Sequence, residues 1–320
     1  MARKGFDPLD MSKVKTYSLS DRDSKVSTAD VCAPPKGGMT LKDYFDGLPN
    51  ILAAKDIKDL ISAIAGAVKE NKTIILAFGA HVIKVGLGPL IVDLIERGIV
   101  SLVAMNGAGI IHDFEMAYIG TTSEDVDSVI GGGEFGMADE TSRMLNGAIN
   151  DGAKLGYGLG EAVGKMIEDE DLPHKKMSIT ASGKRADVPV TVHVAVGTDI
   201  IHMHPGASGE AIGKTSMQDF MTFAAAVATL KDGVYLNIGS AVLLPEVFLK
   251  ALTLARNLGH QVDDFTTVNM DFIRHYRPET NVVRRPTAKS GKGISLVGHH
   301  EIMLPLIFGG VIDALNGCNK

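Results

Sequence analysis

Histidine is concentrated where an α/β protein would place a ligand. Six of the ten histidines lie at or near a predicted strand end or helix start: His81, His112, His202, His204, His299 and His300. An imidazole can move protons near neutral pH, hydrogen-bond a ligand or coordinate a metal ion. His202 and His204 lie two apart on an extended stretch, with Asp199 and Asp113 available, so proton transfer and metal coordination are both open.

Small residues follow four predicted buried strands, in the segments GAHVIKVGLG, NGAGIIHDFE, GTDIIHMHPGASG and GSAVLLPE. Such residues let a ligand approach backbone amides, and a helix that starts in such a turn favours a phosphate. We therefore expect a nucleotide or dinucleotide ligand. No G-x-G-x-x-G follows a predicted strand. The P-loop spacing also fails, because Ser208 stands where its first glycine belongs. Lys214 and Thr215 are accordingly predicted to be helix-entry residues.

A basic run lies near the C-terminus, within HYRPETNVVRRPTAKSGKG: Arg277, Arg284, Arg285, Lys289 and Lys292. It is either a solvated loop or a clamp for a carboxylate or phosphate, which the arginine fork matches.

Short apolar runs alternate with amphipathic stretches along the chain, which predicts strands and helices in alternation. Strands are expected at 73–79, 99–107, 191–196, 233–239, 264–270 and 293–297, and helices at 56–70, 87–98, 216–230, 245–257 and 301–315. Nearly continuous apolar strands indicate a parallel sheet, so the predicted fold is α/β and Rossmann-like, with helices on both faces. The glycine-interrupted segment 131–171 is expected to form a helical lid or packing insertion.

Composition limits the classes of protein. The chain has 320 residues, of which 45% are hydrophobic, so we expect one globular domain over 41–320 after a polar N-terminal arm over 1–40. The net charge of -6 is dispersed, which argues against nucleic acid as a partner. Cys32 and Cys318 suggest no disulfide framework, and neither an exported leader nor a membrane span is predicted, so we expect a cytoplasmic protein.

The order of these pieces after about Leu41 resembles the deoxyhypusine synthase family. NGAGIIHDFEMAYIG is similar to the family's T-A-G-G, E-E-D and Y-L-G series, and VPVTVHVAVGTDIIH to its I-P-V and T-D-G-S segments. LNIGSAVLLPEVFLKALTLARNLG resembles L-G-G-G-V followed by R-N-G, and TTVNMDF resembles N-T-A-Q-E-F-D. ISLVGHHEIMLPLIFGG is similar to the family's closing strand and helix.

This resemblance implies an NAD-dependent transferase that moves a butylamine group from spermidine to a protein lysine. It also implies a homotetramer with sites at subunit interfaces, and places Asp199 where the family contacts the amine. Ten residues are thereby predicted to bind NAD: His81, Gly86, Asn106, Gly107, Ala108, Asp113, Gly239, Ser240, Asn269 and Asp271.

The resemblance fails at the family's imine-forming lysine. Where the family has R-P-D-E-A-V-S-W-G-K, this chain has RPETNVVRRP, which puts Thr280, Arg284 and Pro286 at the glutamate, tryptophan and lysine. Proline has no amine, so only a shifted register could bring Lys289 or Lys292 into the site as the catalytic lysine. A family asparagine appears as His81 and a serine as Lys84, and paired histidines become Pro245 and Glu246.

The sequence thus predicts a deoxyhypusine synthase-like NAD enzyme that does not make deoxyhypusine. Because Lys84 and the arginines replace acidic or neutral residues, the expected small-molecule substrate is an amine or hydroxy compound carrying an anionic group. Asp199 or His202 would take the proton, and the predicted substrate contacts are His204, Glu246, Arg284 and Arg285. Two alternatives are a metal-dependent hydrolase or lyase that uses the histidines, and a non-catalytic NAD-binding oligomer.

Overall fold

Six short strands form one wholly parallel sheet in the computed structural model, which describes residues 5–317. The strands are β1 Ile74–Phe78, β2 Leu102–Asn106, β3 Val190–His193, β4 Val234–Ile238, β5 Thr266–Asp271 and β6 Lys292–Val297. Their order in space is β3-β2-β1-β4-β5-β6. Every residue of β1 and β4 is buried, which explains the unbroken apolar runs in the sequence. The predicted α/β parallel fold is confirmed.

Helices connect the strands and cover the sheet. The α-helices are α1 Leu41–Gly47, α2 Leu52–Lys69, α3 His81–Lys84, α4 Gly88–Glu96, α5 Gly107–Ile119, α6 Val126–Val129, α7 Asp139–Leu155, α8 Leu159–Asp169, α9 Ile179–Ala186, α10 Gly209–Ala228, α11 Leu243–Asn257, α12 Tyr276–Pro278 and α13 His300–Asn316. Short 3-10 turns are η1 Met11–Lys13, η2 Leu19–Asp21, η3 Ile130–Gly132, η4 Lys175–Met177 and η5 Ile200–Met203, and η6 Glu279–Arg284 is a π-helix.

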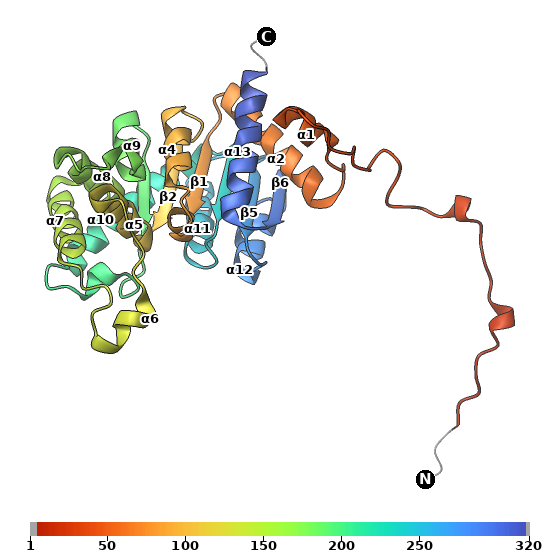
Figure 1. Cartoon of the computed structure of the whole chain (residues 1–320), viewed down its shortest axis with the longest axis horizontal. Helices are drawn as coiled ribbons and strands as arrows, with labels where there is room; N and C mark the ends of the chain where they lie inside the picture. The colour runs from red at the N-terminus through yellow and green to blue at the C-terminus, as the bar shows by residue number, and fades with distance from the viewer. Residues whose placement is uncertain (1–4, 318–320) are drawn as a thin grey trace.

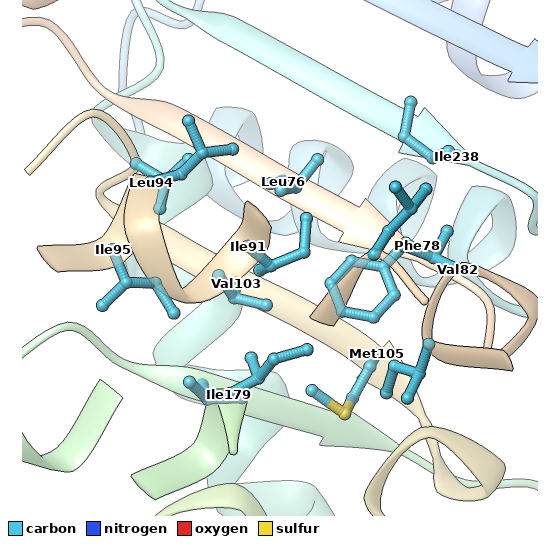
Figure 2. Close-up of a cluster of buried hydrophobic side chains, with 14 of the residues drawn as sticks. Leu76, Phe78, Val82, Ile91, Leu94, Ile95, Val103, Met105, Ile179 and Ile238 are labelled. Atoms are coloured by element: carbon cyan, nitrogen blue, oxygen red, sulfur yellow. The ribbon is translucent and has the colours of Figure 1, made fainter. Parts of the chain in front are cut away.

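Two apolar clusters hold helices on the two faces of the sheet. The larger cluster joins one face to α2, α4, α5 and α13, among others. Figure 2 shows part of it, where Leu76 and Phe78 of β1 lie beside Val103 and Met105 of β2 and the helix residue Ile91. The smaller cluster packs α10 and α11 against the other face through residues such as Phe223, Phe248 and Tyr235. Within residues 5–317, no helix is long and apolar enough to cross a membrane.

The first part of the described chain lies away from this body. Figure 1 shows it running outward in an extended path from α1, with two short turns. Residues 5–29 are all exposed. Backbone hydrogen bonds first join this part of the chain to the residues around α1 at Asp30 and Ala33: Asn50 N donates to Asp30 O (3.1 Å), and Ala33 N donates to Gly47 O (2.9 Å). Thr40 then caps α1 in a capping box with Asp43.

Most of the segment predicted as a lid or packing insertion packs against the rest of the molecule. Its helices α7 and α8 pack with α9, α10 and β3, and their side chains Leu145, Ile149 and Val163 belong to the larger core cluster. Residues 121–138, which contain α6 and which we call the flap, have few buried residues and project from one end of the molecule (Figure 1).

The strand order reverses between β1 and β4, and their ends approach closely there. A Cβ on Gly79, just after β1, would lie 2.3 Å from the carbonyl oxygen of Gly239, just after β4. Gly239 itself has φ +59° and faces the ring of His300. Both positions therefore require glycine, the first for space and the second for conformation as well. In open parallel sheets, ligands bind outside the carboxyl ends of the strands at such a reversal.

Candidate functional site

The ends of β2 and β3 bring a carboxylate onto the N-terminus of α5. Asn106 ends β2 and caps α5, since its Oδ1 accepts from Gly109 N at 3.2 Å. A Cβ on the next residue, Gly107, would lie 2.0 Å from Asp199 Oδ2, and the Ala108 amide donates to the same carboxylate. The glycine is thus required for Asp199 to reach the helix N-terminus, where its negative charge is favoured.

Asp199 and His202 form a nearly buried pair. His202 Nε2 lies 4.0 Å from Asp199 Oδ2, and each side chain is 5% exposed. The other ring nitrogen, Nδ1, accepts from Gly197 N at 3.1 Å, so in the neutral ring the proton is on Nε2, facing Asp199. Neither Nε2 nor Oδ2 has a hydrogen-bond partner. Burial raises the pKa of Asp199, with His202 opposing, so the pair is suited to holding or moving a proton.

A cavity of about 200 Å³ opens beside this pair. It lies between α3, α5, the flap and the Asp199 loop, and five of its lining side chains carry acidic or basic groups: Lys84, His112, Glu115, Glu124 and Asp199. Burial, and then the charge of Lys84, lowers the pKa of His112 to about 4. A neutral imidazole therefore faces a cavity with carboxylates and one ammonium group.

The flap that lines one side of the cavity is tied down at Gly136. The Gly136 amide donates to Glu124 Oε2 at 2.9 Å, and His204 Nε2 donates to the Gly136 carbonyl oxygen at 2.8 Å. His204, predicted to contact substrate, is placed as a tether of the flap.

A second group of rings lies at the reversal in strand order. The ring of Phe272, after β5, stacks on that of His300 at 4.6 Å between centroids, and the His81 ring meets both edge-on at 5.0 and 5.7 Å. His300 is fully buried, and its ring nitrogens make no hydrogen bond of good geometry. Burial lowers its pKa, which the nearby Met270 backbone opposes. Four strand ends, those of β1, β4, β5 and β6, thus meet around a neutral histidine with free hydrogen-bonding capacity.

Other residues predicted to bind the cofactor line the same edge or lie just below it. Ser240 Oγ accepts from Leu244 N at 3.3 Å, and Asp271 Oδ1 accepts from Phe272 N at 2.8 Å. Asn269 lies deeper in the sheet, where its Oδ1 accepts from Asn237 Nδ2 at 2.8 Å. Gly86 is in the turn after α3 with φ +82°.

The buried carboxylate of Asp113 is fully satisfied by hydrogen bonds within the protein and needs no ligand. Its carboxylate accepts four hydrogen bonds, from Ile179 N (2.7 Å), Thr180 N (3.0 Å), Thr180 Oγ1 (2.7 Å) and Ser178 Oγ (2.8 Å). It therefore fixes the N-terminus of α9 against α5, and the structure does not bring it to the cavity.

The basic residues near the C-terminus lie elsewhere. Lys292 begins β6, at the amino edge of the sheet, and pairs with Asp59 of α2. Lys289 is exposed in the loop before that strand. Since a strand of this length spans about 16 Å at ~3.3 Å per residue, both lysines are separated from the carboxyl edge. The shift of register that would bring a catalytic lysine into the site is not observed.

Glu246 and Arg285 belong to a separate polar group on the α11 side. Glu246 Oε1 accepts from Asn281 Nδ2 at 2.9 Å and lies 3.3 Å from Arg277 Nε, and Arg285 Nη1 donates to Asn281 Oδ1 at 2.8 Å. Arg284 is exposed. Glu246, Arg284 and Arg285, which were predicted to contact substrate, do not line the cavity beside Asp199.

The sequence pattern did not identify Glu115, Thr122 or Glu124, and it assigned no specific role to His112. The three-residue spacing of His112 and Glu115 on one helix was the available signal, because such pairs share a helix face. Thr122 and Glu124 carried none, since they lie in the irregular flap.

A metal centre finds no support in the placed side chains. Across residues 5–317, no group of three or more His, Cys, Asp and Glu side chains is arranged to hold a metal ion. His202 and His204 are also engaged with different partners, the Gly197 amide and the Gly136 carbonyl.

Comparison with known proteins gives a likeness of fold. No protein-family model and no curated protein matches the sequence. Among solved structures, a chain from Entamoeba histolytica assigned as a deoxyhypusine synthase matches with TM-score 0.53 at 13% identity, covering 85% of this chain and 93% of that one. AgrE, solved in a ternary complex with ornithine and NAD+, matches with TM-score 0.53 at 12% identity over 83% of this chain.

ArgZ, an arginine dihydrolase from the ornithine-ammonia cycle in cyanobacteria, matches with TM-score 0.52 at 13% identity over 82% of this chain. The match covers 33% of ArgZ and 34% of AgrE, so this chain corresponds to about a third of either protein. The deoxyhypusine synthase-like fold is confirmed at this level.

Proposed function

We propose that this protein is a deoxyhypusine synthase-like enzyme that binds NAD and acts on a small amine or hydroxy compound carrying an anionic group. The observation that carries the proposal is the reversal of strand order between β1 and β4, where Gly79 and Gly239 leave no room for a Cβ. Dinucleotides bind at such a reversal in sheets of this order.

The residues at the reversal fit a dinucleotide. Gly79 and Gly239 allow the ends of β1 and β4 to approach each other, with Ser240 next to them, and the ring nitrogens of buried His300 could provide a donor and an acceptor. His81 and Asp271 complete this edge. AgrE, a protein of the same fold, is solved with NAD+. When bound, NAD would supply a hydride acceptor, and the protein would supply binding, orientation and a base.

The substrate class is supported by the cavity beside Asp199. Lys84 can hold an anionic end, while Asp199 and Glu124 suit a cationic or hydrogen-bonding end. This moves the anion-holding role from Arg284 and Arg285, which lie apart from the cavity, to Lys84.

Deoxyhypusine formation is not proposed, because it requires a lysine amine in the site. Pro286 occupies the family's lysine position, and Lys292 pairs with Asp59 at the opposite edge of the sheet. The homotetramer that the resemblance implies stays a proposal, to be checked by light scattering of the purified protein.

Calorimetric titration with NAD+ and NADP+ tests the proposal. His81→Glu adds a negative charge at this edge of the sheet, which would repel an anionic dinucleotide, and we expect it to weaken binding at least about tenfold, or about 1.4 kcal/mol. His260→Glu is the matched control, because His260 is exposed near the amino end of β5. Equal binding by all three proteins, or no binding by the unmodified one, would leave only the likeness of fold.

A further inference from the structure

Three side chains from α5 and the flap form a hydrogen-bonded chain at the wall of the cavity. Thr122 Oγ1 donates to Glu115 Oε2 at 2.5 Å, and His112 Nδ1 lies 2.6 Å from the same Thr122 oxygen. The second carboxylate oxygen, Glu115 Oε1, accepts from Thr141 Oγ1 at 3.1 Å. All three members of the chain are at least half-buried, so each contact acts in a medium that screens it less than water does.

This chain determines which nitrogen of His112 carries the proton. A carboxylate oxygen can only accept, so the single hydroxyl proton of Thr122 goes to Glu115. The Thr122 oxygen must then accept from His112, which places the ring proton on Nδ1. Nε2 is left with its lone pair. It has no hydrogen-bond partner among the described residues and is not one of the fully buried unpartnered atoms, so it is open to the cavity that His112 lines.

We propose that His112 is a catalytic base that presents Nε2 to the cavity and takes a proton from an N–H or O–H group of the bound ligand, with Thr122 and Glu115 as its positioning residues. The identification of the ligand as the enzyme's substrate rests on the proposed function.

The step is a proton transfer alone. The ligand's N–H or O–H bond breaks, a new N–H bond forms at Nε2, and the ligand keeps the electron pair. The ring becomes a cation with both nitrogens protonated, and its Nδ1–H stays bonded to Thr122. Glu115 compensates the new charge through the hydroxyl, at 3.9 Å from Nδ1. Nothing is oxidised or reduced in this step.

His112 is better prepared for this role than the neighbouring pair. In neutral His202 the free lone pair, on Nδ1, is taken by the Gly197 amide, so that ring presents a donor toward Asp199. Asp199 accepts from the Ala108 amide. Burial, and then the charge of Lys84, disfavours the protonated ring, and the other charged groups that line the same cavity are Glu115, Glu124 and Asp199.

The test is the tautomer of His112, measured by NMR on protein carrying ¹⁵N-labelled histidine, with His112→Gln to assign the signal. We expect the neutral ring at pH 7 to carry its proton on Nδ1. Thr122→Val should shift the ring toward the Nε2–H form, because Nδ1–H loses its acceptor. Thr122→Ser keeps the hydroxyl and should keep the tautomer. Thr141→Val is the matched control, since Thr141 binds Glu115 without touching His112.

Reaction with diethyl pyrocarbonate gives an independent readout, because only an unprotonated, accessible nitrogen attacks it. Peptide mass spectrometry should find His112 modified in the folded protein. Modification should be roughly fivefold slower in Thr122→Val, the factor that one ordinary hydrogen bond is worth, and unchanged in Thr122→Ser and Thr141→Val. An Nε2–H ring in the unmodified protein, or an unreactive His112, would overturn the proposal. Neither readout depends on NAD, so failure here is distinguishable from failure of the cofactor titration.

Discussion

At the scale of single residues, the structure separates side chains that hold the site together from those that face the ligand. Asp199 and His202 face each other, and Asp199 also lines a cavity. Asp113 and His204 carry similar functional groups but are used to fix α9 and the flap. The residue types alone could not distinguish these uses, because both exploit strong hydrogen bonding by buried polar groups.

Asp113→Asn tests the structural use. The amide would turn an NH2 group toward donors that now meet a carboxylate, so we expect a loss of about 2–4 kcal/mol in the free energy of unfolding. Urea denaturation measures it. The control is Asp139→Asn, where the exposed pair with Arg143 should contribute less than about 1 kcal/mol. Equal effects of the two substitutions would show that the hydrogen bonds of Asp113 contribute little.

At the scale of elements, the strands and long helices follow from the sequence pattern, whereas the irregular segments do not. The predicted strand 233–239 and observed Val234–Ile238 nearly coincide, because a buried strand must be apolar throughout. Helix α10 begins at Gly209, seven residues before its predicted start, because the Ser208 side chain caps it by accepting from Ala211 N. That cap also explains the glycine-rich stretch around it: exposed Lys214 and buried Thr215 are helix residues.

The candidate site was less predictable than the fold, for a physical reason. Residues at strand ends, such as Asn106 and Asp199, could be placed because parallel strands end at one edge. The flap residues Thr122 and Glu124 could not, since no periodicity determines where an irregular loop returns. The positions of Lys289 and Lys292 could not be predicted for the same reason. The chain between β5 and β6 crosses to the amino edge of the sheet before Lys289.

His204→Leu tests the flap as an element. Without the bond from His204 Nε2 to the Gly136 carbonyl, we expect amides of residues 121–138 to exchange with deuterium about five times faster, as for loss of about 1 kcal/mol of local stability. Hydrogen-exchange mass spectrometry measures this. His204→Gln retains a donor and should restore slow exchange. Unchanged exchange in the leucine variant would mean that other contacts hold the flap.

At the scale of the whole molecule, buried titratable groups make stability depend on pH. Burial lowers the pKa of His193, at the end of β3, to about 4, below its ordinary value of 6.5. The unfolded chain therefore takes up this proton first as pH falls, and His193 contributes stability above pH 6.5 that is lost between 6.5 and 4. His112 acts with the same sign. Asp219, whose pKa burial raises to about 7, acts with the opposite sign over pH 4 to 7.

The contribution of His193 can be isolated by comparing how steeply the free energy of unfolding changes with pH in two proteins. Between pH 6.5 and 4, the free energy of unfolding of His193→Gln should fall less steeply than that of the unmodified protein, by at most about 1.4 kcal/mol per pH unit. Urea denaturation at several pH values measures both slopes. The control is His260→Gln at an exposed position, which should leave the slope unchanged. Parallel slopes for His193→Gln would contradict the assignment.

The pairing of β1 with β4 has a consequence for how the protein folds. Ile74 pairs with Val234, so the strands at the reversal are separated in the chain by the whole of the β2 and β3 half, while β1 and β2 are close in sequence. Joining β1 to β4 closes the longest loop in the sheet and carries the largest closure entropy. We therefore expect the proposed dinucleotide site to assemble late during refolding, after the β1–β2 core. The ligand would then bind only to molecules in which β1 has already paired with β4.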